Sequence, residues 1–274
     1  MKQSQDKNKA FHHKRSLGQN FLTDDALFRQ LVELSGVGKD DAVLEIGAGA
    51  GGMTKALSAA CRRVIAIEVD SALIPILQVA LEKNKNVHLV HGDVLRLNLP
   101  QLTAPMGPFH IVANIPYYLT TDLMNLLLTS QMPIQSISLM VQKEAAERMT
   151  ARPGDEGYGM LAVRAQYSYD PAIVLDVPAC LFTPPPKVDS AFVVMPRRKA
   201  PPVQVQDEAL FFKVAASAFA MRRKTMENNL IASFRVPREQ AREWLAACSI
   251  PVGARGETLS LSDFAALANR MRSV

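Results

Sequence analysis

The chain has 274 residues, of which 48% are hydrophobic and 21% are charged, and its formal net charge is +5. This composition is typical of a folded globular protein and excludes disorder, collagen or coiled coil as the dominant state. No apolar run approaches the ~18 residues of a membrane span, the basic start lacks the apolar core of a secretory signal, and the three widely separated cysteines suit a reducing cytoplasm.

The first part of the chain predicts strands that alternate with helices. Residues 1–16 lack periodicity and are predicted to form a basic, mobile tail, and Thr23 is expected to cap a helix whose first turn holds Asp24 and Asp25. Short apolar runs then predict five strands, at residues 42–46, 63–68, 87–91, 109–113 and 136–141. Helical patterns accompany them at residues 53–60, 71–82, 120–130 and 143–150. This alternation predicts an α/β fold with a parallel sheet that helices cover on both faces.

Two further strand candidates, residues 172–177 and 190–196, are joined by the proline-rich stretch PACLFTPPPKVD rather than by a long helix. We therefore predict that they form an antiparallel hairpin at the edge of the sheet. Residues 200–206 are predicted to be a linker. Beyond the linker, helical patterns cover residues 207–220, 222–233, 238–247 and 260–272, so we predict a large domain at 17–200 and a small all-α domain at 201–274.

The positive charge is concentrated at the two ends of the chain. Residues 1–23 hold five basic side chains and one acidic side chain, residues 24–200 hold 16 and 18, and residues 201–274 hold ten and seven. A near-neutral body with basic ends suits a polyanionic partner such as RNA. Charge alone does not distinguish this interpretation from a solvated tail and ordinary helix faces.

A glycine-rich loop follows the first predicted strand. Strand 42–46 leads into Gly47-Ala48-Gly49-Ala50-Gly51-Gly52 just ahead of a helix, where the backbone can turn tightly and approach a ligand closely. The loop lacks the Lys-Ser/Thr pair of a phosphate-binding loop, which argues against a nucleoside triphosphatase. Glu68 ends the second strand, 21 residues after Gly47. A carboxylate at that position can accept hydrogen bonds from both ribose hydroxyls of a nucleoside.

The third predicted strand ends in Gly92-Asp93. A carboxylate there can accept a hydrogen bond from an adenine amino group, although an ordinary turn aspartate is equally expected at such a position. The loop, Glu68 and Asp93 together describe an adenosine pocket at the carboxyl ends of the strands. Both NAD and S-adenosylmethionine fit such a pocket.

The fourth predicted strand leads into Asn114-Ile115-Pro116-Tyr117. Pro116 keeps Ile115 extended and has no N–H, which leaves the Ile115 carbonyl free to face the site. Together with the Asn114 side-chain oxygen, it can hold the two N–H groups of an exocyclic amine, so that the nitrogen lone pair faces an electrophile. Tyr117 supplies a ring on which a planar base can stack. This motif favours S-adenosylmethionine over NAD.

In this order the glycine loop, Glu68, Asp93 and the Asn-Ile-Pro-Tyr motif resemble those of the S-adenosylmethionine-dependent RNA adenine N6-methyltransferases. Three further stretches narrow the resemblance to the KsgA-type small-subunit rRNA adenine N6,N6-dimethyltransferases: QNFL at 19–22, FTPPPKVDS at 182–190 and FAMRRKT at 219–225. Asn-Ile-Pro-Tyr also occurs in resistance-conferring large-subunit rRNA methylases, so this motif does not select the substrate. The stretch FTPPPKVDS favours the small-subunit enzymes.

The resemblance implies a Rossmann-like class I methyltransferase domain at 17–200 and a helical rRNA-binding domain at 201–274. It implies S-adenosylmethionine as the methyl donor, without a metal. The residues assigned to the donor are Asn20, Leu22, Gly47, Gly49, Glu68, Asp93 and Asn114. Those assigned to the acceptor adenine are Asn114, Ile115, Pro116, Tyr117 and Phe182. Those assigned to RNA are Lys187, Arg222, Arg223 and Lys224.

The implied reaction is dimethylation of N6 of two adjacent adenosines in the 3′-terminal hairpin of small-subunit (16S) rRNA, late in small-subunit biogenesis. The implied partner is a pre-subunit particle, and the protein is expected to be a cytoplasmic monomer that does not bind membranes. Two alternatives stay open, an enzyme that methylates adenine N6 in large-subunit rRNA and a ribosome-assembly factor on a methyltransferase fold. Loss of Asn114, Glu68 or Asp93 would favour the assembly factor, and all three are present.

Overall fold

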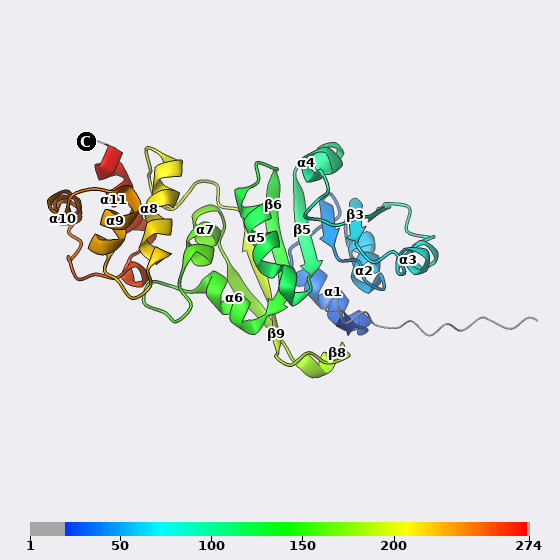
Figure 1. Ribbon diagram of the computed structural model, residues 1–274. Helices are drawn as coiled ribbons and strands as arrows, with labels where there is room; N and C mark the ends of the chain where they lie inside the picture. Colours follow the sequence, from blue (N-terminus) through cyan, green and yellow to red (C-terminus); the bar gives the residue numbers. More distant parts are fainter. Residues whose placement is uncertain (1–19, 273–274) are drawn as a thin grey trace, which may run out of the picture.

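The computed structural model describes residues 20–272, and its centre is a seven-stranded sheet of order β4-β3-β2-β5-β6-β9-β7 (Figure 1). Its strands are β2 (Ala42–Ile46), β3 (Arg63–Glu68), β4 (Val87–His91), β5 (Phe109–Asn114), β6 (Ile134–Gln142), β7 (Ala172–Val177) and β9 (Ser190–Pro196). The strands from β2 to β6 pair in parallel, which confirms the predicted parallel sheet. The predicted tail at 1–16 lies outside the described residues.

The predicted antiparallel hairpin is confirmed at one edge of this sheet. β9 pairs antiparallel with β6 on one side and with the edge strand β7 on the other. Because β9 runs against β6, its first residue lies beside the last residues of β6, at the carboxyl edge of the parallel strands. The proline-rich loop ahead of β9 also holds β8 (Phe182–Thr183), which pairs with β1 (Phe21–Leu22) in a separate two-stranded sheet.

The sheet carries helices on both faces, as predicted. The helices up to the hairpin are α1 (Asp25–Leu34), α2 (Gly52–Ala60), α3 (Ile74–Ala80), α4 (Leu99–Thr103), α5 (Thr120–Thr129), α6 (Lys143–Thr150) and α7 (Met160–Ser168). One core packs α1 and α2 against the sheet, and a second core packs α5 and α6 against the opposite face. Successive side chains along β2 point to opposite faces of the sheet, so Val43 packs in the first core and Leu44 and Ile46 pack in the second.

Several helices differ from the predictions. The cap of α1 is Asp24, one residue after the predicted Thr23, because the Asp24 Oδ1 accepts hydrogen bonds from the backbone N–H groups of Ala26 (2.7 Å) and Leu27 (3.2 Å). Helices α4 and α7 were not predicted. The helix expected at 222–233 begins only at Met226, because Thr225 caps it and the basic residues before it form a turn.

The C-terminal helices gather at one end of the molecule (Figure 1). They are α8 (Glu208–Ala220), α9 (Met226–Phe234), α10 (Arg238–Ala247) and α11 (Leu261–Arg272). Their core includes Trp244 and also takes in Tyr158 and Tyr167, whose hydroxyls donate to the Leu259 carbonyl and the Glu208 carboxylate. The boundary between the predicted domains 17–200 and 201–274 stays a prediction. Within residues 20–272, no helix is long and apolar enough to cross a bilayer.

The central strand β2 carries an acid into the core. Glu45 is 1% exposed and lies next to the glycine loop. Burial, and to a smaller extent the neighbouring Glu68 carboxylate, raise the pKa of Glu45 from 4.5 to about 8. The folded protein therefore holds this group protonated at neutral pH.

This raised pKa predicts that stability falls as the pH rises from about 5 to about 8. Between about pH 5 and pH 8 the folded state holds a proton on Glu45 that the unfolded state has released, so the free energy of unfolding should fall as pH rises, by up to about 1.4 kcal/mol per pH unit from this group. Glu45→Gln should flatten the decline in urea unfolding measured across that range. Glu33→Gln, on the exposed surface of α1, is the matched control and should leave the decline unchanged. Equal slopes for the wild type and Glu45→Gln would contradict the assignment.

Candidate active site

A cavity of about 290 Å³ opens at the carboxyl ends of β2, β3, β4 and β5. The order of the sheet explains its place, because the chain fills β3 and β4 on one side of β2 and then returns to place β5 on the other side. Loops that leave β2 and β5 in opposite directions leave a crevice between them. The predicted site residues that line the cavity are Asn20, Gly47, Gly49, Glu68, Asp93, Asn114, Ile115, Pro116, Tyr117 and Phe182.

The glycine loop closes one wall of the cavity. Gly47 and Gly49 have φ angles of 81° and 57°, in the left-handed region that glycine adopts without strain. A Cβ on Gly49 would lie 3.3 Å from the Phe21 ring, and one on Gly47 would lie 3.4 Å from the Asn114 carbonyl oxygen. Glycine at these two positions therefore lets the loop approach both the amino-terminal strand β1 and the end of β5.

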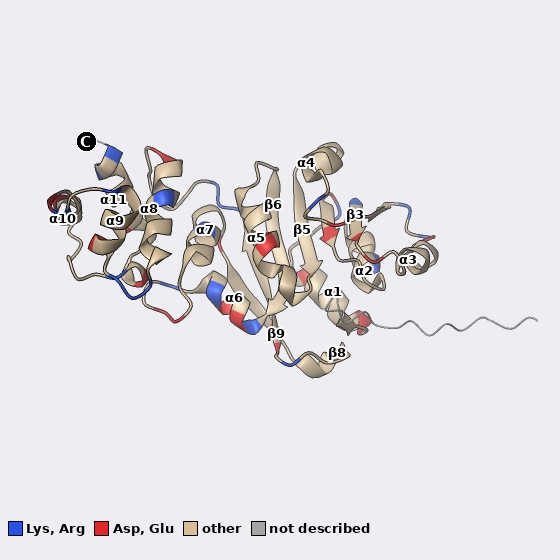
Figure 2. Cartoon of the chain, in the orientation of Figure 1, with Lys and Arg blue, Asp and Glu red and all other residues tan. Residues whose placement is uncertain are grey.

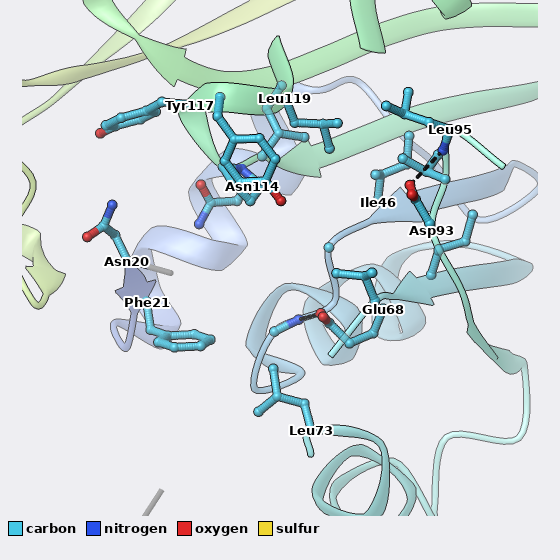
Figure 3. Close-up of a pocket in the computed structure, with 18 of the residues that line it drawn as sticks. Asn20, Phe21, Ile46, Glu68, Leu73, Asp93, Leu95, Asn114, Tyr117 and Leu119 are labelled. Carbon is cyan, nitrogen blue, oxygen red and sulfur yellow. Dashed lines mark hydrogen bonds between the residues drawn. The ribbon is translucent and has the colours of Figure 1, made fainter. Parts of the chain in front are cut away.

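Glu68 is the most firmly held acid of the cavity. It is 5% exposed, and its two carboxylate oxygens accept hydrogen bonds from the backbone N–H groups of Gly49 and Asp70, each at 2.8 Å. Figure 3 shows the bond from Gly49. Each oxygen retains a lone pair for a further donor. The carboxylate therefore shapes the glycine loop and at the same time presents a fixed pair of acceptors to a ligand.

Asp93 combines the two interpretations that its sequence position left open. It lines the cavity, and its Oδ1 also accepts a hydrogen bond from the Leu95 N–H at 3.0 Å, as a turn aspartate does. Its Oδ2 lies 3.4 Å from the Arg96 Nε, but that side chain is 87% exposed and the ion pair is weak. The turn orients the Asp93 carboxylate toward the cavity.

Asn114 and Tyr117 lie at the other end of the cavity, together with Asn20 (Figure 3). Asn114 is the last residue of β5, and Pro116 separates it from a single 3₁₀ turn at Tyr117–Leu119. Ile115 is 2% exposed and belongs to the core, and it also lines the cavity. The arrangement places amide and carbonyl acceptors beside an aromatic ring.

The Tyr117 hydroxyl shares a hydrogen bond of 2.8 Å with the hydroxyl of Ser190. Burial raises the pKa of Tyr117, and the nearby Asp189 carboxylate adds to the effect. The phenol therefore stays protonated at neutral pH. The motif FTPPPKVDS contained this partner, but its spacing to Tyr117 gave no signal, since the two residues are 73 positions apart.

The strands β1 and β8 join the amino-terminal segment to the proline-rich loop over the cavity. Phe21 pairs with Thr183 and Leu22 with Phe182. Side chains alternate along so short a strand, so Phe21 lines the cavity while Leu22 packs in the core at 5% exposed. Leu22, which was assigned to the donor, is not among the residues that line the cavity. Phe21, to which no role was assigned, faces the cavity.

The four residues assigned to RNA lie outside the cavity and are exposed. Lys187 lies in the loop ahead of β9, and Arg222, Arg223 and Lys224 form the turn between α8 and α9, among the basic positions of the C-terminal helices (Figure 2). The start of this basic turn (residues 222–224) is attached to α9, because the Asn229 side-chain oxygen accepts a hydrogen bond from the N–H of Met221, the residue just before the turn. Across residues 20–272 there is no group of three or more His, Cys, Asp or Glu side chains that could hold a metal ion.

Comparison with known proteins agrees with this geometry. The family model described as ribosomal RNA adenine dimethylase matches residues 10–272. Ribosomal RNA small subunit methyltransferase A of Geobacillus thermodenitrificans is 41% identical over 268 residues, which cover 95% of this chain and 92% of the relative. The protein of the same name from Enterococcus faecalis is 40% identical over 273 residues, 97% of this chain and 92% of the relative.

Two solved structures share the whole architecture. The 23S rRNA methyltransferase ErmE superposes with a TM-score of 0.74 at 26% identity, over 92% of this chain and 100% of its own. A dimethyladenosine transferase from Plasmodium falciparum superposes with a TM-score of 0.77 at 24% identity, over 90% of this chain and 95% of its own. Both have the class I methyltransferase sheet with an antiparallel edge and C-terminal helices. The family match over nearly the full length, the identity of about 40% and the shared fold together show that this chain belongs to the ribosomal RNA adenine dimethylase family.

Proposed function

We propose that this protein transfers methyl groups from S-adenosylmethionine to N6 of two adjacent adenosines in the 3′-terminal hairpin of small-subunit (16S) rRNA, late in the biogenesis of that subunit. The observation that carries the proposal is the division of the cavity into two ends. One end has the two carboxylates Glu68 and Asp93, which suit a nucleoside, and the other has the acceptors and ring of Asn114 and Tyr117. The names of the relatives support the small subunit as the substrate.

The donor half of the cavity matches the chemistry of an adenosine. Glu68 would accept hydrogen bonds from the two ribose hydroxyls, because both of its oxygens are fixed by backbone N–H groups and retain free lone pairs. Asp93 would accept from the adenine amino group. Gly47, Gly49 and Asn20 would line the remainder. Bound there, S-adenosylmethionine supplies a methyl group on a sulfonium.

The acceptor half would hold the target adenine outside its stack. The Asn114 side-chain oxygen and the Ile115 carbonyl would accept from the two N6 hydrogens, with Pro116 keeping that carbonyl extended. Tyr117 and the 3% exposed Phe182 would contact the two faces of the base. With its hydrogens held by these acceptors, the N6 lone pair would face the methyl carbon in line with its bond to sulfur, so that N6 could take the methyl group as that bond breaks and the neutral thioether leaves, and the N6 proton would afterwards pass to water. Orientation and exclusion of water supply most of the acceleration, and no metal takes part in the proposed step.

The partner we propose is a pre-subunit particle, bound by a monomer in the cytoplasm. Residues 17–200 would carry the chemistry, and residues 201–274 would hold the RNA. Arg222, Arg223 and Lys224 would contact phosphates together with Lys187, because all four are exposed and belong to two loops that face away from the cores. Phosphate contacts of this kind position a protein on RNA without reading its sequence.

The product is the direct test of the proposed function. Unmethylated small subunits, incubated with the protein and S-adenosylmethionine, should yield N6,N6-dimethyladenosine at two adjacent positions near the 3′ end when the rRNA is digested and analysed by mass spectrometry. Large-subunit rRNA should remain unmodified. Methylation of the large subunit instead would support the alternative of a large-subunit rRNA methyltransferase, which the structural similarity to ErmE favours. Binding without any methylation would support an assembly factor.

Asn114→Ala tests whether the acceptor half of the cavity acts separately from the donor half. We expect methyl transfer to fall by about 100-fold or more, since a poorly oriented amine loses the advantage of position. Donor affinity, measured by calorimetry, should stay within a small factor. Near-normal turnover in a radiolabelled methyl-transfer assay would contradict the role of Asn114.

The matched counterpart is Glu68→Ala, which we expect to weaken donor binding by about 100-fold or more, because two hydrogen bonds to a charged group are lost and each contributes about 1.5–3 kcal/mol. An unchanged calorimetric affinity would reject the ribose contact. Circular dichroism and thermal melting of both variants check that the glycine loop, which Glu68 also holds, has not unfolded with it.

The basic turn should strengthen rRNA binding through the release of counterions from the RNA. Arg222→Gln, Arg223→Gln and Lys224→Gln combined should flatten the plot of log affinity for rRNA against log salt by about two to three units of slope. The control removes the same charge elsewhere, by Lys39→Gln, Lys83→Gln and Lys85→Gln, ahead of the amino ends of β2 and β4 and opposite the cavity. Equal slopes for the two triple variants would show that net charge, and not this turn, governs binding.

A further inference from the structure

Ser190 is a buried residue to which the proposed chemistry assigns nothing. It is 0% exposed, it is the first residue of β9, and its hydroxyl lies 2.8 Å from the Tyr117 hydroxyl. Tyr117 enters the proposed reaction through its ring alone. The hydrogen bond between the two hydroxyls joins the loop after β5 to the edge hairpin.

Ser190 is held rigidly from both sides. Its backbone pairs with Gln142 of β6 and with Val177 of β7. The residue before it is fixed as well, because the Asp189 carbonyl accepts from the Lys143 N–H at 3.0 Å and the Asp189 carboxylate accepts from the Ala179 N–H at 2.8 Å. A hydroxyl at this position is therefore a stationary anchor at the carboxyl edge of the sheet.

Tyr117 needs such an anchor. It begins a single 3₁₀ turn directly after a proline, and such turns have poor hydrogen-bond geometry and hold their residues weakly. The ring is partly exposed on the cavity side, and its neighbour Tyr118 is 60% exposed. Fixing the phenol oxygen restricts both torsions of the side chain and so sets the plane of the ring.

We propose that Ser190 is a positioning residue for methyl transfer, which holds the Tyr117 hydroxyl and thereby sets the ring plane against which the acceptor adenine stacks. The inference rests on the proposed function. Since transfer in line tolerates little rotation of the amine, a ring that turns freely lowers the fraction of bound adenines that can react. The hydroxyl of Ser190 touches neither donor nor acceptor and acts through Tyr117.

A double-mutant cycle tests this directly. Ser190→Ala and Tyr117→Phe each remove the hydrogen bond, and we expect each to lower kcat roughly three- to tenfold, the range for loss of one hydrogen bond, with the donor dissociation constant nearly unchanged. In the Tyr117→Phe background, Ser190→Ala should add nothing. Two losses that multiply in the double variant would overturn the proposal, since Ser190 would then act independently of the phenol.

Ser138→Ala is the matched control. Ser138 is also 0% exposed and lies in the neighbouring strand β6, but among residues 20–272 its hydroxyl has no hydrogen-bond partner. The same substitution in the same sheet should leave kcat unchanged. Thermal melting of all four variants checks the fold, and a loss of kcat in Ser138→Ala equal to that in Ser190→Ala would show a general effect of the core and overturn the proposal.

A second readout needs no substrate. In protein labelled with ¹³C on tyrosine rings, the Tyr117 signals are identified by their absence in Tyr117→Phe. We expect them to shift and broaden in Ser190→Ala and to stay in place in Ser138→Ala. Unmoved signals in Ser190→Ala would overturn the proposal. If the wild type made no dimethyladenosine while these signals moved, the proposed function would fail and the hold of Ser190 on Tyr117 would stand.

Discussion

The arrangement of the site depends on the Glu68 carboxylate, which accepts hydrogen bonds from two backbone N–H groups. Its bond from Gly49 determines where the glycine loop turns, and its bond from Asp70 fixes the chain just beyond β3. The loop then lies close enough to Phe21 and to the end of β5 that a methyl group on Gly49 or Gly47 would contact them. The donor wall, the amino-terminal segment and the acceptor motif therefore take their places relative to this acid.

The antiparallel hairpin completes the site from the other side. A purely parallel sheet would end at β6 and leave the acceptor motif open to solvent. The hairpin reverses direction, so the loop before β9 returns to the carboxyl edge, where it brings Phe182 to the cavity and Ser190 to the Tyr117 hydroxyl. Its pairing with β1 then joins residues that are about 160 positions apart in the chain. The departure from parallel pairing thus contributes Phe182 to the end of the cavity that holds Asn114 and Tyr117.

Most strands of the seven-stranded sheet could be predicted because they are short apolar runs that end at or just before a glycine, an acid or a proline. Asn114-Ile115-Pro116-Tyr117 could be placed because its residue types have few other uses. Side-chain partners over long separations could not. Nothing local indicates that Ser190 bonds to Tyr117 or that Leu22 turns into the core, since both follow from pairings that only the folded sheet creates. Helix α7 was not predicted because its apolar residues meet two cores and show no one-sided periodicity. The start of α9 was placed too early because basic residues suit a helix and a turn equally well.

The proposed function requires both attraction of the RNA and orientation of the reacting groups, and different parts of the molecule would supply them. The basic turn and Lys187 lie outside the cavity, where long exposed side chains can contact phosphates but cannot fix the rotation of a base. Exposed lysine and arginine contribute attraction that salt screens. In the proposed function, orientation requires groups that do not move: a carboxylate held by two N–H groups would fix the donor, and a ring held by a buried hydroxyl would fix the rotation of the base. Under the proposed function, a net charge of only +5 suffices for a large polyanion, because exposed basic side chains would attract the RNA to the surface, while fixed, hydrogen-bonded groups in the cavity would determine which atom reacts.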